Sequence, residues 1–165
     1  CSTAIELNPQ VLAVCRSWFK LPPDGEMLRV VLADAGEEIR SPEWRATVDA
    51  LAVDLYDDNA AAPVLDSADF YADCRALLTD EGAMTVNLFG RAASYGESLE
   101  KIATVFGEDA VWVFKPTREG NAIVLALRTP QPLKRAELQA RGEAIQARWD
   151  LPAAKWVRIF KPLAI

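Results

Sequence analysis

Five side chains that could bind or deprotonate a ligand follow the ends of predicted strands. The first strand ends at Glu6 and the second at Asp34; the third ends at Asp54, with Asp57 close behind, and the fourth at Asn87. In open α/β sheets, ligands bind beyond the carboxyl ends of the strands. The sequence therefore predicts a site at one edge of the sheet, made of four acids and one amide. Any one of these acids, taken alone, is more simply a helix N-cap or a solvated loop residue.

Glu6 stands at a strand end directly before Asn8-Pro9. A carboxylate in this position can accept hydrogen bonds from both ribose hydroxyls of a nucleoside. In nucleotide folds of this kind, a glycine-rich turn precedes the acid by roughly 20 residues. Counting back from Glu6 by that distance runs past Cys1, so we expect the first strand and its glycine turn to be absent from this chain.

Asp54 and Asp57 stand three residues apart, just past a buried strand. Two neighbouring carboxylates could hold an ammonium group, and one of them could accept its proton as the amine becomes a nucleophile. The alternative is a turn in which Asp57, Asp58 and Asn59 hydrogen-bond to their own backbone. Asp54, at the strand end itself, is harder to assign to such a turn.

The composition excludes several classes of site. The 165 residues contain no histidine, which rules out Ser-His-Asp and Cys-His catalysis and any zinc site with a histidine ligand, and we expect no bound metal. A formal charge of −6 argues against nucleic-acid binding. Three scattered cysteines indicate a reducing, cytoplasmic setting. No apolar run reaches the roughly 20 residues that cross a membrane, so no membrane contact is expected.

Hydrophobic periodicity predicts the elements that would position these residues. Apolar strands are expected at 3–7, 28–33, 50–53 and 84–88, and two late strands, at 111–114 and 122–127, form an antiparallel hairpin. Helices are expected after Asn8, from about Gly36, from Asp66 or Ser67 to Gly82, at 99–106 and at about 133–149. This alternation is typical of an α/β, Rossmann-like, doubly wound sheet, here in a single domain of residues 1–165.

The motifs, taken in order, resemble the spermidine synthase (polyamine aminopropyltransferase) family, a branch of the class I methyltransferase-type fold. The resemblance runs over nearly the whole chain. Residues 4–9 are similar to the family's acidic strand-end motif, 33–35 to its Gly-Asp-Ala segment, 53–57 to its Asp-x-x-Asp signature, and 116–120 to its late Pro-Thr-x-x-x-Gly turn.

The resemblance implies a nucleoside site and an amine site. Glu6 would bind the ribose, and Asp34 with its neighbour Ala35 would bind the adenine of decarboxylated S-adenosylmethionine. At the amine site, Asp54 would be the catalytic base, with Asp57 as a second ligand of the polyamine. Asn87, which stands where the family has glutamine, is a further substrate-binding candidate.

The reaction that the resemblance implies is a direct displacement. An amine nitrogen of a diamine such as putrescine, deprotonated by Asp54, attacks the aminopropyl carbon next to the sulfonium, and methylthioadenosine leaves. Alignment of the substrates and removal of the ammonium proton would supply most of the catalysis, without a metal or a covalent intermediate.

The sequence departs from the family pattern in four places. Residues 58–63 replace the usual Pro-x-Gly-Pro element of the gate loop, Asn87 replaces a glutamine, Phe114-Lys115 occupies the region of an expected tyrosine, and Arg118 stands where an aromatic residue is common. A cation at Arg118 would repel a polyamine. These changes resemble those of divergent bacterial spermidine synthase-like proteins.

Three functions therefore remain open. The first is an aminopropyltransferase, the second an S-adenosylmethionine-dependent transferase on the same scaffold, and the third a catalytically inactive family member, which the missing glycine turn favours for these 165 residues. The resemblance also implies a homodimer. Because the chain begins at what would be the second strand, we expect a sheet that lacks its central strand, or one in which a rearrangement or a neighbouring chain fills that place.

Overall fold

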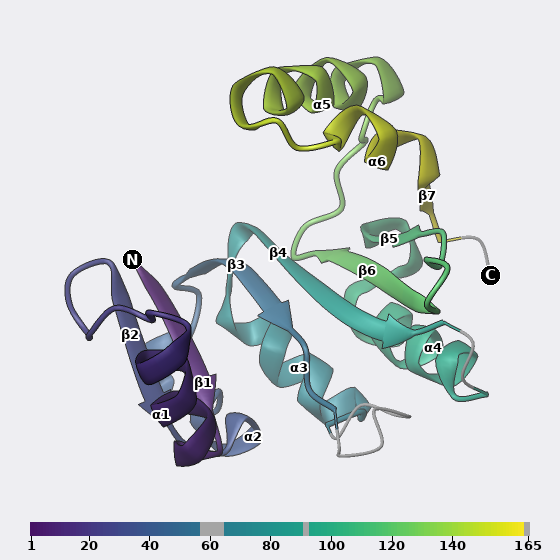
Figure 1. Cartoon of the computed structure of the whole chain (residues 1–165). Helices are drawn as coiled ribbons and strands as arrows, with labels where there is room; N and C mark the ends of the chain where they lie inside the picture. Colours follow the sequence, from purple (N-terminus) through teal and green to yellow (C-terminus); the bar gives the residue numbers. More distant parts are fainter. Residues whose placement is uncertain (57–64, 91–92, 164–165) are drawn as a thin grey trace. The chain divides into compact units, whose positions relative to one another are not determined.

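The computed structural model describes residues 1–56, 65–90 and 93–163, and the chain forms two compact units, 1–44 and 45–165 (Figure 1). Each unit has its own sheet, of two strands in the first and five in the second. The expected lack of a central strand stays a prediction. The assignment of the whole chain to a single domain stays a prediction.

The first unit is a parallel strand–helix–strand arrangement. Strand β1 (Ser2–Glu6) pairs with β2 (Leu28–Leu32), with Glu6 opposite Leu32. Helix α1 (Pro9–Trp18) connects them; the Asn8 side chain caps it by accepting from the Gln10 N–H, and Pro9 occupies the first turn, where it costs no hydrogen bond. A short helix α2 (Ala35–Glu38) and the 3₁₀ turn η1 (Pro42–Trp44) follow. The predicted strands and helix starts of this region are confirmed.

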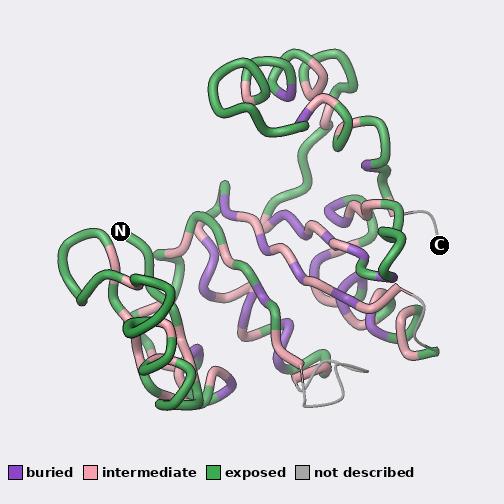
Figure 2. Tube along the Cα trace, in the orientation of Figure 1, coloured by how far each residue is buried: buried purple, intermediate pink, exposed green. Residues whose placement is uncertain are grey.

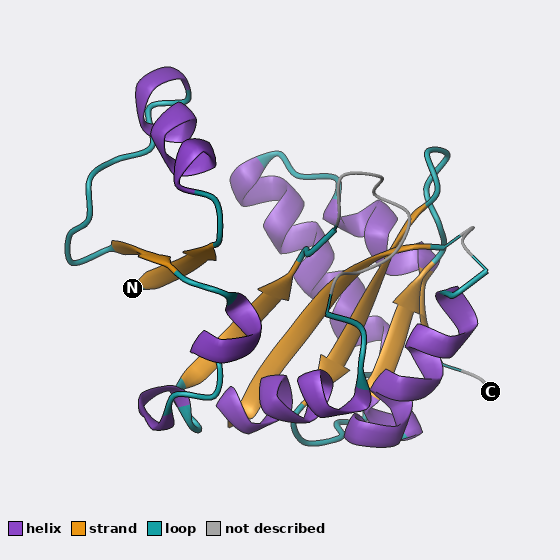
Figure 3. Ribbon diagram, turned by 90° about the horizontal axis from the view of Figure 1, so that it is seen from below, coloured by secondary structure: helices purple, strands orange, loops and turns teal. Residues whose placement is uncertain are grey.

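The second unit is built on a mixed sheet with the strand order β3-β4-β6-β5-β7. Its strands are β3 (Val48–Val53), β4 (Leu78–Phe89), β5 (Val111–Phe114), β6 (Asn121–Leu127) and β7 (Phe160–Pro162). Strands β3 and β4 are parallel, whereas the β4–β6, β5–β6 and β5–β7 pairs are antiparallel. The predicted hairpin of the two late strands is thereby confirmed, and Figure 3 shows the strands side by side with helices packed along them.

Helices α3 (Ala68–Leu77) and α4 (Tyr95–Phe106) lie side by side on one face of this sheet (Figure 1). Along β4 the buried residues alternate, so that Met84, Val86 and Leu88 face the helices while the residues between them are half-exposed. Figure 2 shows the buried positions concentrated in these strands and helices. The turn η2 (Glu108–Ala110) then leads into β5.

Two regions differ from the sequence prediction. The helix predicted to continue to Gly82 ends at Leu77, and β4 begins at Leu78. Gly82 lies inside β4, where a Cβ atom would come within 2.8 Å of the Val48 carbonyl oxygen. This glycine therefore allows a close approach of two strands rather than ending a helix.

The second difference lies at the C-terminal end. Helix α5 (Arg135–Trp149) matches the prediction, and a further helix α6 (Ala153–Ile159) packs against it before β7. The tail from 156 to 160 thus contains a helix and the start of an edge strand. A helix of seven residues is too short to show a clear amphipathic period in sequence.

Candidate functional site

In the first unit, Glu6 and Asp34 lie at the carboxyl ends of two paired strands. Glu6 is the last residue of β1, and its backbone carbonyl accepts from the Ala33 N–H at 3.1 Å, one residue before Asp34. Glu6 Oε1 accepts from the Asn8 N–H at 2.7 Å. The two acids are thus held at the same edge of this small sheet.

Asp34 is the N-cap of α2. Its Oδ1 accepts from the N–H groups of Gly36 at 2.8 Å and Glu37 at 3.2 Å, and Ala35 is the first residue of the helix. The simpler alternative weighed for this acid, a helix cap, is therefore what the structure contains. The role of Asp34 and Ala35 toward an adenine stays a prediction.

In the second unit, the structure brings Asp54 and Asn87 into contact. Asp54 directly follows β3, and Asn87 lies near the carboxyl end of β4. Asn87 Nδ2 donates to Asp54 Oδ1 at 3.0 Å. The amide oxygen, Asn87 Oδ1, is buried and has no donor among the described residues.

Tyr56 is a third member of this site. Its hydroxyl donates to the backbone carbonyl of Asn87. Burial and, second, the negative charge of Asp54 raise the pKa of Tyr56 above its ordinary value, so the phenol keeps the proton that it donates. Sequence reasoning missed this residue, because a tyrosine two residues after a strand end carries no recognisable signal.

The turn that connects β5 and β6 reaches the same end of β4. The Gly90 N–H donates to the Gly120 carbonyl at 2.7 Å, three residues after Asn87. Gly120 has φ +110°, a conformation that L residues with a side chain rarely adopt. The predicted late turn at 116–120 is therefore a glycine-dependent turn beside the strand end that carries Asn87.

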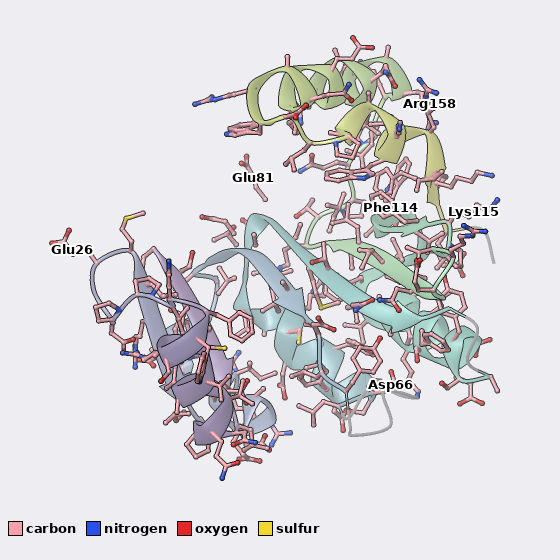
Figure 4. All side chains as sticks on the ribbon, in the orientation of Figure 1. Glu26, Asp66, Glu81, Phe114, Lys115 and Arg158 are labelled. Atoms are coloured by element: carbon pink, nitrogen blue, oxygen red, sulfur yellow. The ribbon has the colours of Figure 1, made fainter. Side chains whose placement is uncertain are left out.

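A polar cluster around Asp66 joins α3 to α4 and was also missed. Asp66, labelled in Figure 4, accepts from the Tyr71 hydroxyl at 2.8 Å, from Ser98 Oγ at 3.0 Å and from Lys101 Nζ at 2.7 Å. Ser98 is almost fully buried, so the cluster lies within the packed region between the helices. Of the two cap candidates for α3, Ser67 is the one used, since its Oγ accepts from the Phe70 N–H.

Asp57 and the gate-loop residues 58–63 lie outside the described residues. The gathering of Glu6 and Asp34 with Asp54 at one edge stays a prediction. Within the described ranges, no group of three or more cysteine and carboxylate side chains is arranged to hold a metal ion. None of the described helices combines the length and apolar character that a bilayer crossing requires.

Two named relatives support the resemblance seen in the motifs, although no protein-family model matches the sequence. A polyamine aminopropyltransferase from Chromobacterium violaceum is 30% identical over 161 residues, which are 97% of this chain and 60% of that protein. One from Neisseria meningitidis is 29% identical over 150 residues, covering 90% of this chain and 56% of the relative. The chain therefore spans at most 60% of the length of these two relatives.

Solved structures show the fold class. A probable spermidine synthase from Corynebacterium glutamicum superposes with a TM-score of 0.69 at 21% identity, over 94% of this chain and 59% of that one. Human methyltransferase-like protein 13, in complex with SAH, gives a TM-score of 0.76 at 23% identity, over 100% and 73%. The Rossmann-like, class I methyltransferase-type fold is thereby confirmed. Over nearly its whole length the chain is similar to these polyamine aminopropyltransferases, which agrees with the resemblance of its motifs to the spermidine synthase family.

Proposed function

We propose that this chain is the part of a polyamine aminopropyltransferase that transfers an aminopropyl group from decarboxylated S-adenosylmethionine to a diamine such as putrescine. Glu6 binds the ribose, and Asp34 with Ala35 binds the adenine. Asp54 is the base, Asp57 is a second carboxylate for the amine, and Asn87 contacts the amine through its amide oxygen. The proteins named as relatives above support this assignment of the reaction.

The contact between Asp54 and Asn87 is the observation that carries the proposal. It occurs at the first aspartate of the family's Asp-x-x-Asp signature, just past a strand, where α/β sheets bind ligands. The Asn87 side-chain amide donates a hydrogen bond to Oδ1 of Asp54. The second carboxylate oxygen, Oδ2, can accept an ammonium proton. The buried oxygen Asn87 Oδ1 offers a second acceptor next to it. The carboxylate of Asp54 thus gives the pair the negative acceptor that a cationic substrate requires.

The chemistry follows from these acceptors. Asp54 takes a proton from the ammonium group of the diamine, and the freed nitrogen lone pair forms the new bond to the aminopropyl carbon. The bond from that carbon to sulfur breaks, its electron pair stays on sulfur, and neutral methylthioadenosine leaves. Because the sulfonium is already a good leaving group, the protein needs only to align the reactants and accept the proton.

Calorimetry with methylthioadenosine, decarboxylated S-adenosylmethionine and S-adenosylmethionine tests the substrate class. The proposal predicts that the decarboxylated compound binds more tightly than S-adenosylmethionine, whose carboxylate would meet an acceptor-rich site. Tighter binding of S-adenosylmethionine would instead favour a methyltransferase on the same fold. Binding of none of the three would favour a catalytically inactive member of the family.

We also propose that the protein assembles as a homodimer in the cytoplasm, as the resemblance implies. Large apolar side chains on the second unit support an interface, since Trp149 is 55% exposed and Trp156 42% exposed. Sedimentation velocity at micromolar concentration distinguishes the dimer from a monomer. A single species at the mass of one chain would contradict this part of the proposal.

A further inference from the structure

Backbone pairing stops just before the candidate base. The last matched pair of β3 and β4 is Val53 with Val86. Asp54 therefore lies beyond this ladder, and side-chain hydrogen bonds connect residues 54–56 to β4. The position of the base then depends on those side-chain bonds.

Among the residues that the structure describes, two side-chain hydrogen bonds make this connection, and both involve Asn87. The side-chain amide of Asn87 donates to Asp54 Oδ1 at 3.0 Å, and the Tyr56 hydroxyl donates to the Asn87 backbone carbonyl. Because Tyr56 is only two residues after Asp54, the two bonds and the intervening backbone form a closed ring. Within this ring, residues 54–56 cannot turn away from β4 without breaking one of the bonds.

The Tyr56 bond is the one that restrains the backbone. A carboxylate contact alone can follow a side-chain rotation, whereas the bond from Tyr56 ties the chain after β3 to the main chain of β4. The ring of Tyr56 is half-buried, which limits its own movement. Tyr56 therefore restrains the segment while Asn87 orients the carboxylate.

We propose that Tyr56 is a positioning residue for the aminopropyl transfer, whose hydroxyl bond to the Asn87 carbonyl fixes Asp54 for proton removal from the amine. This role rests on the proposed function, because it is exerted through Asp54 and needs no contact between Tyr56 and substrate. Tyr56 stands at one of the two unspecified positions of the Asp-x-x-Asp signature, and the proposal gives this position a structural role.

The first test is structural and does not need activity. In ¹⁵N-labelled protein, the two side-chain amide protons of Asn87 should have well-separated NMR shifts, because one of them is bonded to a carboxylate. Tyr56→Phe removes only the hydroxyl and should bring the two shifts together. Tyr95→Phe is the matched control, since Tyr95 is also a half-buried tyrosine of the second unit and should leave the Asn87 signals unchanged.

The second test is kinetic. Tyr56→Phe should lower kcat about tenfold, a loss of roughly 1.4 kcal/mol of transition-state stabilisation, and leave the Kd for decarboxylated S-adenosylmethionine within twofold. In an Asp54→Asn background, Tyr56→Phe should cause no further loss, because Tyr56 acts through Asp54. A role in general stability would instead lower the rate further in that background.

The outcomes separate the two proposals. The positioning role would be overturned if the Asn87 signals of Tyr56→Phe matched those of Tyr95→Phe. It would also be overturned if the two variants had equal kcat values. If the wild-type protein transfers no aminopropyl group but the Asn87 signals still collapse in Tyr56→Phe, Tyr56 does position Asp54 and the proposed reaction is what fails.

Discussion

At the scale of single residues, Asp54 carries the chemical step of the proposed reaction. Asp54→Asn keeps the size of the side chain but removes the negative charge that accepts the proton. We expect transfer to fall by at least a hundredfold, in the range of lost general-base catalysis, while binding of methylthioadenosine changes less than twofold. Single-turnover rates and calorimetry on the same preparation measure the two quantities. A variant that retained most of its activity would show that Asp54 is not the base.

Cys74 gives a second residue-scale prediction, which concerns pH. Burial, more than the neighbouring charge of Asp73, raises the pKa of the Cys74 thiol from 9.0 to about 12. Cys1 is exposed and Cys15 half-exposed, so at pH 8 a thiol reagent should label these two in the folded protein and Cys74 only after denaturation.

The same raised pKa makes stability depend on alkaline pH. Above pH 9 the unfolded chain releases a proton that the folded Cys74 retains, so the free energy of unfolding falls as pH rises toward 12. The contribution of this thiol is at most about 1.4 kcal/mol per pH unit and is fully present below pH 9. Urea titrations of wild type and Cys74→Ala between pH 8 and 10.5 should show a shallower decline in the variant. Equal slopes would contradict the assignment.

At the scale of elements, the turn between β5 and β6 depends on one glycine. Gly120 has φ +110°, and a Cβ atom there would come within 2.6 Å of the Phe89 ring. Gly120→Ala should therefore destabilise the protein by about 1–3 kcal/mol, measured by chemical denaturation.

Gly96→Ala is the control for the turn. Gly96 lies in α4 with open space around it, so alanine should be neutral or stabilising there by about 0.5–1 kcal/mol. If the two substitutions had the same effect, the turn geometry would not be the cause.

The elements also show which features the sequence could predict. Asn8 and Pro9 fix the start of α1 because capping and the missing proline N–H act locally. The acids at strand ends were also identifiable from local sequence, because each follows a short apolar run that marks a strand. Gly82 was misread because its function depends on the approach of Val48, which is distant in sequence. The hydrogen bonds of Tyr56 and Asp66 were missed because most of their partners are 31 to 35 residues away in sequence. Only the bond between Asp66 and Tyr71 joins near neighbours among these.

At the scale of the whole molecule, the buried core is unevenly divided between the two units. Every hydrophobic residue that the structure describes as buried lies in 45–165, with the exception of Ile39. In 1–44, α1 has no buried residue, and Trp18 and Phe19 are 80% and 76% exposed. The first unit thus has few of the contacts that stabilise a fold, whereas the second has a packed sheet and two covering helices (Figure 2).

This division predicts that residues 45–165 fold without residues 1–44. The fragment 45–165 should keep a cooperative urea transition and a circular dichroism spectrum of mixed α/β type, because its core is complete within it. The peptide 1–44 should be largely unfolded, since a two-stranded sheet and a ten-residue helix are each marginal in water. The Asp54–Asn87 contact should survive in the fragment, and the side-chain amide signals of Asn87 report on it directly. Loss of the cooperative transition in 45–165 would mean that this unit does not fold on its own.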